Sequence, residues 1–570
     1  MAANHIKDGQ KHAIFWDLAE QYMTNARCLQ WSSRNVGVDR LHYYKLLAMA
    51  VTCLEAVLHQ QCTSEIEIRT RLRHATILFK HTSNRHEAEQ SVNRAIQVAK
   101  RDGLVDLMFA AQLLLVKILH ASSPKAAHAL LVTSAASARQ SGYVQWLYSF
   151  QLLHLEIGKG NSIRGTLRAM SQFSSSRGDS YVFALAKLLE AMHHLGRGEE
   201  GSDQALQALS EFDESIDSSQ LQLLHCILKA LHATTLHNMA LAIERMKILH
   251  QLVDESGGRR NTLHTWKTDG SFKLALNTNG SQGSHMLCIK WANGAMATAL
   301  TYLVSGLARL QTLDSKSSKF FAQGLRMIDA ILTSDKPPPG LMEGDLHRLY
   351  DYLLLYAALG CTMRHDLEKS GSLLSQVANA SHCRTFQRAV DLLTTTSRHI
   401  MEPNEATIKA YDSIAKQSDE FGKLAFLNQS LLVNEQASLL SLDSNIEANK
   451  LLLVACEMLA AIQSIDGEMI TRRKALATTV SVSTESGNSQ LQMIALGFLA
   501  TQWVGVENEQ ASKIATASYL LATKQNDHAW ALACGGLLVD VYREMGKSAM
   551  ASKQEILNEQ HATGSNFPNL

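Results

Sequence analysis

Proline is nearly absent from this chain, and that shortage constrains the fold more than any other feature. The 570 residues include six prolines, which is about 1% where about 5% is usual. Three of the six are adjacent, at Pro337–Pro339. A proline inside a helix removes a backbone donor and clashes with the preceding turn, so a chain this depleted has long stretches that are free to be helical. The sequence therefore predicts an all-α protein.

Hydrophobic periodicity supports this fold class. From about residue 40 to about residue 560, amphipathic segments of helical length alternate with short turns rich in Gly, Ser and Asn. In the segment 40–60, apolar residues recur at the i, i+3/i+4, i+7 spacing that lines one face of a helix. These residues are Leu46, Leu47, Ala50, Leu54, Val57 and Leu58.

Many helices in series indicate a repeat, and the segment 69–100 carries the pattern of one. Small residues let two paired helices approach, and large residues fill the groove between them. The tetratricopeptide (TPR) pattern of about 34 residues has this arrangement. Its large and small positions are matched by Leu72, Phe79, Ala88, Val92 and Ala95. The sequence predicts a TPR-like helical-repeat superhelix, which is an α-solenoid.

A second match to the TPR pattern is weaker. It places Phe150, Ile157, Thr166 and Met170 at the expected positions, but Phe173 stands where a small residue is preferred. Looser matches follow near the C-terminus, around Leu496-Gly497 and in a helical hairpin over 540–560.

One stretch, 253–285, interrupts the helical pattern because it is rich in Gly, Ser, Thr and Asn and has no sustained apolar stripe. Long loops of this kind are usually functional or disordered. The predicted organisation has five parts. These are a partly flexible N-terminal segment (1–39), an N-terminal TPR-like array (40–252), a long loop or linker (253–285), a C-terminal TPR-like array (286–562) and a flexible tail (563–570).

Charge and cysteine content exclude several classes of function. With 54 Lys+Arg against 53 Asp+Glu the net charge is +1, so no general basic field attracts phosphates, and direct DNA binding is predicted to be weak or absent. The nine cysteines contain no CxxC pair, which argues against a disulfide framework or a zinc knuckle. No sufficiently long uncharged apolar run and no secretion signal is found, so we expect an intracellular protein without a membrane partner.

Motifs for catalysis, cofactors and metals are also lacking. Gly196–Gly201 matches GxGxxG formally, but it follows a helical segment, and its two glutamates would repel a phosphate. His86-Glu87 begins like HExxH, yet Gln90 replaces the second histidine. The sequence therefore predicts a non-enzymatic protein with no catalytic, cofactor-binding or metal-ligating residues.

A solenoid without catalytic residues normally works through its concave surface, which the first helix of each TPR unit lines. The residues expected to line it and to bind a partner peptide are Thr70, Arg73, Ile77, Lys80 and His81 from the first match, and Tyr148, Gln151, Leu155 and Lys159 from the second. Their mixture of cationic, aromatic, amide and apolar groups suits an extended acidic and apolar peptide.

Several blocks of residues carry a resemblance to a known family. They are Cys53–Val57, Arg69-Thr70 with Leu72, Leu78, His81-Thr82 with Asn84, Ala88, Ala95, Phe150–Leu152 with Leu155, Leu496-Gly497, Ala529–Leu532 and Gly546. In order and spacing the chain resembles the cohesin loading factor family over about 40–560, most specifically at 69–95. The Gly- and Asn-rich composition of 253–285 departs from the family pattern.

This resemblance implies a non-enzymatic scaffold, the smaller TPR-built subunit of a two-subunit cohesin loader. Such a subunit envelops the extended N-terminal segment of a large HEAT-repeat loader subunit (the Nipped-B-like or adherin subunit) in a heterodimer. The pair helps to load cohesin onto chromosomes for sister-chromatid cohesion and segregation. The resemblance further implies a nuclear, chromatin-associated protein that meets cohesin indirectly, with chromatin-bound receptors as further candidate partners.

Two alternatives remain open from the sequence. The first is an unrelated TPR scaffold that binds short peptide motifs in another multiprotein assembly. The second is a helical-repeat enzyme accessory or transferase whose site lies in 253–285, where His264, Trp266, Lys267 and Asp269 would carry the activity.

Overall fold

The computed structural model is built almost entirely of helices. It describes residues 8–32, 40–158, 160–197, 201–254, 266–278, 283–312, 315–334, 343–377, 384–417, 420–433, 454–455, 457–459, 462 and 469–564. The first series of helices comprises α1 (Asp8–Ser32), α2 (Arg40–Leu58), α3 (Ser64–His81), α4 (Arg85–Arg101), α5 (Val105–His120), α6 (Pro124–Gln140), α7 (Val144–Ile157), α8 (Asn161–Arg177), α9 (Ser180–Leu195), α10 (Ser202–Ser210), α11 (Ser219–Thr235) and α12 (Met239–Asp254).

A two-stranded sheet and a second series of helices follow. The strands are β1 (Ser271–Ala275) and β2 (Met286–Lys290). The helices are α13 (Gly294–Leu310), α14 (Ser315–Leu332), α15 (Glu343–Thr362), α16 (Leu367–Gln376), α17 (Arg384–Met401), α18 (Glu405–Ala415), α19 (Glu420–Val433), α21 (Met469–Ser486), α22 (Ser489–Thr501), α23 (Asn508–Gln525), α24 (His528–Glu544) and α25 (Ser548–Gly564). The fold is that of an all-α solenoid with one small sheet added.

The pair α3–α4 forms as the TPR pattern predicts. Thr63 precedes α3 and its hydroxyl accepts from the Ile66 N–H, while acidic residues in the first turn and basic residues in the last suit the helix dipole. The small and medium residues Ala88, Val92 and Ala95 are all 0% exposed at the interface between the two helices. Leu72 and Phe79 pack against them. The first repeat assignment is confirmed.

The pair α7–α8 also forms, in spite of the large residue at its last pattern position. Phe150 and Met170 are fully buried. Phe173 is accommodated because it lies edge-on to Tyr148, with ring centroids 5.8 Å apart, and because the Arg139 guanidinium covers its ring at 5.2 Å. An aromatic–cation contact thus replaces the close helix approach that a small residue would permit.

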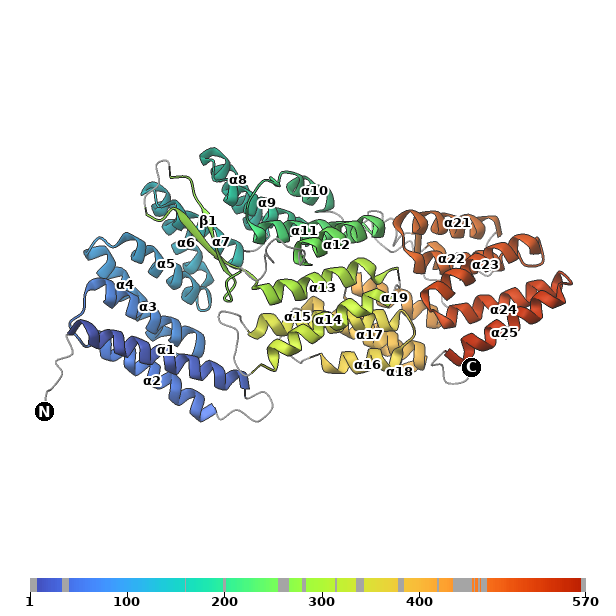
Figure 1. Ribbon diagram of the computed structural model, residues 1–570, viewed down its shortest axis with the longest axis horizontal. Helices are drawn as coiled ribbons and strands as arrows, with labels where there is room; N and C mark the ends of the chain where they lie inside the picture. Colours follow the sequence, from blue (N-terminus) through green and yellow to red (C-terminus); the bar gives the residue numbers. More distant parts are fainter. Residues whose placement is uncertain are drawn as a thin grey trace.

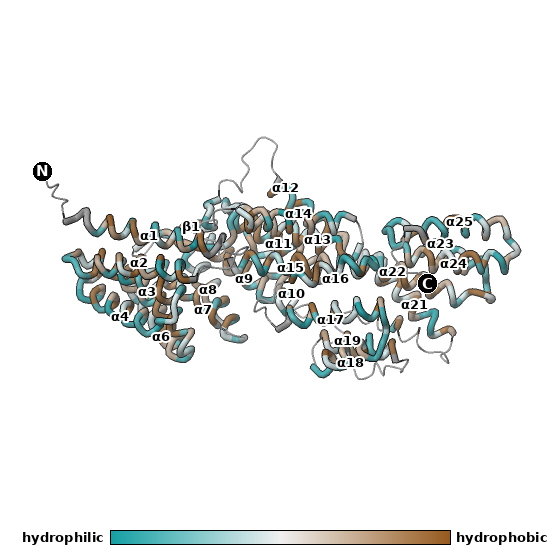
Figure 2. Tube along the Cα trace, turned by 90° about the horizontal axis from the view of Figure 1, so that it is seen from below, coloured by the Kyte–Doolittle hydropathy of each residue, from teal (hydrophilic) through white to brown (hydrophobic). Residues whose placement is uncertain are grey.

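The helices stack side by side into an elongated superhelix, with the N-terminus at one end and α25 at the other (Figure 1). In the first half of the chain, alternate helices make contact at α3 with α5, α5 with α7, α9 with α11 and α11 with α13. Neighbouring helix pairs of a solenoid come closest on the inner side of its curve. The odd-numbered helices therefore line the inner side of the first half. In Figure 2, α4 and α6 run along the opposite side from α1.

The segment 1–39 was expected to be partly flexible, but it contains the 25-residue helix α1. This helix packs along α2, and the two share a core with α3. The core comprises Ala19, Met23, Ala26, Leu46, Leu47, Ala50, Leu54 and Ile77. Helical packing thus begins well before residue 40. Residues 565–570, most of the expected tail, lie outside the described residues.

The segment 253–285 is not simply a loop. Its residues 271–275 form β1, which pairs antiparallel with β2, with Lys273 opposite Cys288. From the start of α13 the two strands reach back to the first half of the chain (Figure 1), where β1 contacts α9 and β2 contacts α7. This β-hairpin therefore lies on the inner side of the N-terminal array, and the expectation of a long linker is corrected for these residues.

Alternation of side chains explains why the β-hairpin is stable there. Phe272, Leu274 and Leu287 are buried in one cluster with Tyr148 of α7 and helices α8 to α11. The other face of the strands, including Lys273 and Lys290, is exposed. One apolar face is what a two-stranded sheet needs, because alone it would be only marginally stable.

The C-terminal helices include the repeats that the sequence indicates around Leu496-Gly497 and over 540–560. Gly497 of α22 lies against Trp530 of α24, where a Cβ atom would be 2.7 Å from the indole ring. The turn between α24 and α25 includes Gly546, whose φ of 69° lies in the left-handed region. Gly497 thus allows two helices to approach closely, and Gly546 permits the left-handed turn between α24 and α25.

By length and composition alone, the 18 residues Leu41–Leu58 of α2 could cross a membrane. In the structure, the buried residues of α2 pack against α1 and α3, as the core face of an amphipathic helix does. Its outer face exposes Leu41 and Tyr44.

Several histidines are core residues, and His225 of α11 is the clearest example. It is 4% exposed, stacks on Phe212 at 4.1 Å and donates from Nε2 to the Leu209 carbonyl oxygen at 3.1 Å. Burial and the nearby Lys229 ammonium lower the pKa of His225 to about 4. The imidazole is therefore neutral in the folded chain at neutral pH.

We expect His225 to make the region around α11 acid-labile. The unfolded chain takes up a proton at this histidine as pH falls below about 6.5, whereas the folded chain does not until about 4. Stability is thus lost progressively as pH falls through that interval. Hydrogen exchange of α11 amides at pH 5 and pH 7.5 measures it, and His225→Phe should flatten the difference. The matched variant of an exposed histidine, His86→Phe, should leave it unchanged, and equal profiles for all three proteins would contradict the prediction.

Candidate functional site

The first set of expected partner-binding residues lies on the face of α3 that meets α1. The Trp16 indole N–H of α1 donates to the Thr70 hydroxyl at 3.0 Å. The guanidinium of Arg73 pairs with the Glu20 carboxylate of α1 at 2.6 Å. At the end of α3, His81 Nδ1 is 2.9 Å from the Tyr43 hydroxyl of α2. Helix α1 thus covers much of the surface that was expected to bind a peptide.

The structure corrects the assignment of Thr70, Ile77 and Tyr148 to a peptide-binding surface. Thr70 is 0% exposed, Ile77 is 1% exposed and Tyr148 is 0% exposed. Ile77 belongs to the core shared by α1, α2 and α3, and Tyr148 lies under the β-hairpin. Their side chains hold elements of this chain together and offer no surface to a partner.

Lys80 differs from its neighbours because it is exposed and lies among other cations. Partial desolvation lowers its pKa, and so do Lys117 of α5, Lys290 of β2, and Arg27 and Arg73. Partial burial lowers the pKa of His81 as well, helped by Arg27, Lys80 and Arg73. Four elements that are distant in sequence therefore bring like charges together.

We call this group the basic surface; it comprises Arg27, Arg73, Lys80, Lys117 and Lys290. Among the residues that the structure describes, acidic partners of this group are few: Arg73 pairs with Glu20, and Lys117 lies 3.5 Å from Glu156, in a pair exposed to solvent on both sides. Like charges held together repel one another, and an anionic ligand relieves that repulsion. The basic surface is the candidate functional site of this chain.

The structure says less about the remaining contact residues expected on and after α7. Gln151 and Leu155 on α7 are half-buried, and the buried Oε1 of Gln151 accepts no hydrogen bond from the described residues. Lys159 lies outside the described residues. Gln151 and Leu155 remain predictions as contact residues.

A buried carboxylate adds polar contacts between the β-hairpin and the N-terminal array. Asp179, at the start of α9, has a side chain that is 0% exposed. It accepts from the Tyr148 hydroxyl at 2.7 Å, from the Asn277 backbone N–H at 2.6 Å and from Arg177 Nε at 3.2 Å. Burial and the bond to Asp179 raise the pKa of Tyr148. This contact positions Lys290 over the inner side of the array.

Of the four residues in 253–285 that could have formed an enzyme site, two have structural contacts. The Trp266 indole is 7% exposed and donates to the Ser219 hydroxyl at 2.8 Å. Asp269 accepts from the backbone N–H and the hydroxyl of Ser271, which shapes the turn before β1. Lys267 is exposed, and His264 lies outside the described residues.

Sequence reasoning missed the β-hairpin and with it Lys290. The signal was present as two short alternations, Phe272 with Leu274 and Leu287 with Ile289, each too brief to stand out among turn residues. It also missed a cluster of possible metal ligands, Glu55, His74 and Glu87, which three helices bring together.

Comparison with known proteins agrees with this architecture. The family model described as cohesin loading factor matches residues 11–549, nearly the whole chain. No curated protein sequence matches significantly.

Solved structures give a fold-level likeness. A crystal structure of Scc4 in complex with Scc2n is similar with a TM-score of 0.65 at 11% identity, covering 97% of this chain and 99% of that one. A circular tandem repeat protein with a novel repeat topology covers the same shares at 13% identity, but its TM-score of 0.13 is too low to bear on the fold. The Scc4 likeness extends over the helical array from end to end.

Proposed function

Because the chain belongs to the cohesin loading factor family, we propose that it is the non-enzymatic scaffold subunit of a cohesin loader. Its inner side would hold an extended N-terminal segment of the large HEAT-repeat loader subunit in a heterodimer. The similar Scc4 structure is a complex with Scc2n, which supports this kind of partner. Family membership also disfavours the alternative of an unrelated TPR scaffold.

The observation that carries the proposal is the basic surface. It lies where α1, α3, α5 and the β-hairpin converge, and Lys80, Lys117 and Lys290 leave charge exposed there. An extended segment with acidic residues at intervals would place carboxylates against these cations in charge-assisted hydrogen bonds. Apolar residues between the acidic ones would pack against the half-buried surface of α7.

A long superhelix suits a partner segment that is disordered before it binds. Ordering such a segment costs conformational entropy, and that cost is offset when the segment buries a large surface. A solenoid offers this surface along its whole length, so many modest contacts add up. Binding would in turn stabilise the solenoid by mass action.

The chain would contact chromosomes mainly through protein partners and less through direct binding of DNA. The net charge of +1 gives the chain no general attraction to phosphates, although the basic surface is locally positive. We propose a nuclear, chromatin-associated protein that reaches cohesin through the large subunit and supports cohesin loading and sister-chromatid cohesion. Chromatin-bound receptors are further candidate partners.

The test is purification of the tagged full chain from its native cells, with mass spectrometry of stoichiometric partners. We expect one very large HEAT-repeat protein at equal stoichiometry and cohesin subunits at lower occupancy. The N-terminal segment of that protein, expressed together with the chain, should form a complex that survives size-exclusion chromatography, whereas an equally long segment from elsewhere in it should not. A set of small clients without a large partner would contradict the proposal.

A further inference from the structure

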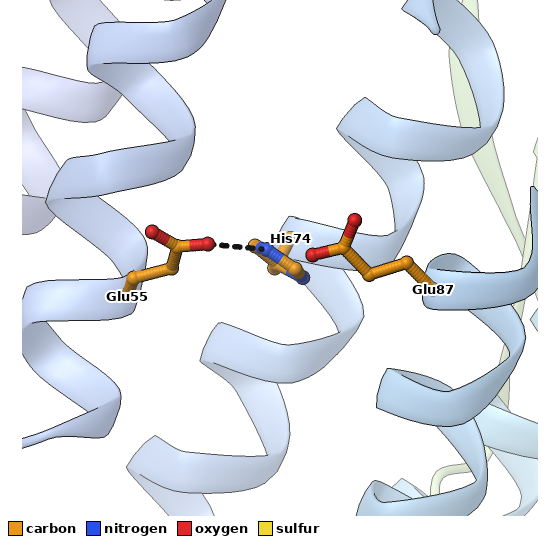
Figure 3. Close-up of side chains that lie close together, drawn as sticks. All are labelled: Glu55, His74 and Glu87. Atoms are coloured by element: carbon orange, nitrogen blue, oxygen red, sulfur yellow. Dashed lines mark ion pairs between the residues drawn. The ribbon is translucent and has the colours of Figure 1, made fainter. Parts of the chain in front are cut away.

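Three side chains from three consecutive helices meet at one point in the N-terminal array. Glu55 comes from α2, His74 from α3 and Glu87 from α4, and one ligand atom of each lies within 4.8 Å of the others. Figure 3 shows the imidazole between the two carboxylates. The sequence gives no hint of this group, because its members are separated by 19 and 13 residues along the chain and follow no metal-binding motif.

The imidazole of His74 makes this group unusual. The residue is 5% exposed, and neither ring nitrogen has a hydrogen-bond partner among the described residues. A buried polar group without a partner costs about 1–3 kcal/mol, and most such groups in proteins are satisfied by a neighbour, a water molecule or an ion. The His74 ring therefore lacks a hydrogen-bond partner in the described part of the chain, and an ion bound to one of its nitrogens would supply one.

The spacing of the atoms fits an ion better than a direct bond. His74 Nε2 and Glu55 Oε1 are 3.6 Å apart, beyond the usual range of a hydrogen bond. Two ligands on a tetrahedral Zn²⁺, each about 2.0–2.1 Å from the metal, lie about 3.4 Å apart. The pair thus has nearly the separation of two ligands of one zinc ion.

The other groups nearby hold the ligands in place. Asn84, at the start of α4, donates a long hydrogen bond of 3.4 Å to Glu87 Oε2, which fixes the carboxylate near the first turn of its helix. Glu55 projects from α2, whose buried side anchors it to α1 and α3. All three ligands stand on helices, which hold a metal site more precisely than loops do.

We propose that Glu55, His74 and Glu87 bind one Zn²⁺ ion, with solvent as the fourth ligand. Imidazole nitrogen and carboxylate oxygens are a ligand set that zinc accepts. The ion would join α2 to the α3–α4 repeat and so fix the first turn of the superhelix, from which α1 and α3 contribute to the basic surface. Zinc would then act as a structural clamp at the N-terminal end of the array.

The experiment is a metal titration of the full chain after removal of metals with a chelator and dialysis. Isothermal titration with Zn²⁺ should show one site of micromolar or tighter affinity, and Co²⁺ at the same site should give the visible absorption of a tetrahedral or five-coordinate ion. Glu87→Gln and Glu55→Gln should each weaken Zn²⁺ binding at least tenfold. Glu65→Gln, which changes a glutamate of α3 that pairs with Arg69 at the surface, should not.

Two results would overturn the proposal. One is a full chain that binds neither ion stoichiometrically. The other is equal Zn²⁺ affinity in Glu87→Gln and Glu65→Gln, which would place any bound metal elsewhere.

Discussion

Replacing Asp179 by alanine is expected to release the β-hairpin from the N-terminal array. The buried carboxylate accepts hydrogen bonds from Tyr148, Arg177 and the Asn277 backbone. Its removal leaves three donors unsatisfied, one of them a guanidinium charge with a side chain only 16% exposed. Removing one partner from a buried, charged hydrogen-bond network typically costs about 3–5 kcal/mol. This is the largest effect on stability that we expect from a single polar substitution.

Hydrogen exchange of the full chain measures the release. In Asp179→Ala, amides of β1 and β2 should exchange faster by about a hundredfold or more, since about 1.4 kcal/mol corresponds to a factor of ten. Asp345→Ala is the matched control, because that aspartate forms an exposed pair with Arg348 worth at most about 1 kcal/mol. Unchanged protection of the strands in Asp179→Ala would show that the carboxylate is not needed, and that apolar packing and the two hydrogen bonds between Arg177 and Asn277 hold the β-hairpin.

The helical fold follows from local patterns, which is why the sequence predicts it well. In α3 and α4, the residues that decide the packing, such as Phe79, Ala88 and Val92, lie within a few turns of one another. The 3.6-residue period and the cap at Thr63 need no knowledge of distant segments. Repeats with this property can be recognised one at a time.

The β-hairpin could not be predicted in the same way. Its strands have five residues each, and their apolar faces are explained only by contact with helices much earlier in the chain. The bond from Arg177 to the Asn277 carbonyl spans 100 positions. No local pattern in 253–285 reveals where such a partner lies.

Only part of the candidate site could be predicted, because a local pattern shows which residues share a face of α3 but not which distant helix covers that face. The TPR pattern correctly puts Thr70, Arg73 and Ile77 on one face of α3, but that face is covered because α1 belongs to the array. Trp16 and Glu20 of α1 provide the contacts. Lys80 lies one turn beyond Ile77 and stays exposed, whereas Arg73 is partly covered by its pair with Glu20.

Reversing three charges of the basic surface is expected to weaken partner binding strongly. In the variant Lys80→Glu, Lys117→Glu, Lys290→Glu, each new carboxylate would repel the acidic segment that the lysine attracted. At roughly 1 kcal/mol for each exposed position, the loss is about 2–3 kcal/mol, or a fall in affinity of about 30- to 150-fold. Titration of the co-expressed partner segment at several salt concentrations measures this loss, and the salt dependence should become shallower.

The folded chain itself should tolerate these substitutions. The three lysines are exposed to solvent, so the new carboxylates stay hydrated, and the exposed pair of Lys117 with Glu156 that is lost is worth at most about 1 kcal/mol. The control, Lys513→Glu, Lys547→Glu, Lys553→Glu, changes exposed lysines of α23, of the turn before α25 and of α25 and produces the same net charge. If both triple variants bind the segment equally well, net charge and not the basic surface determines affinity. If only the first loses binding while its unfolding temperature is unchanged, the inner side of the N-terminal array is where the partner's acidic residues lie.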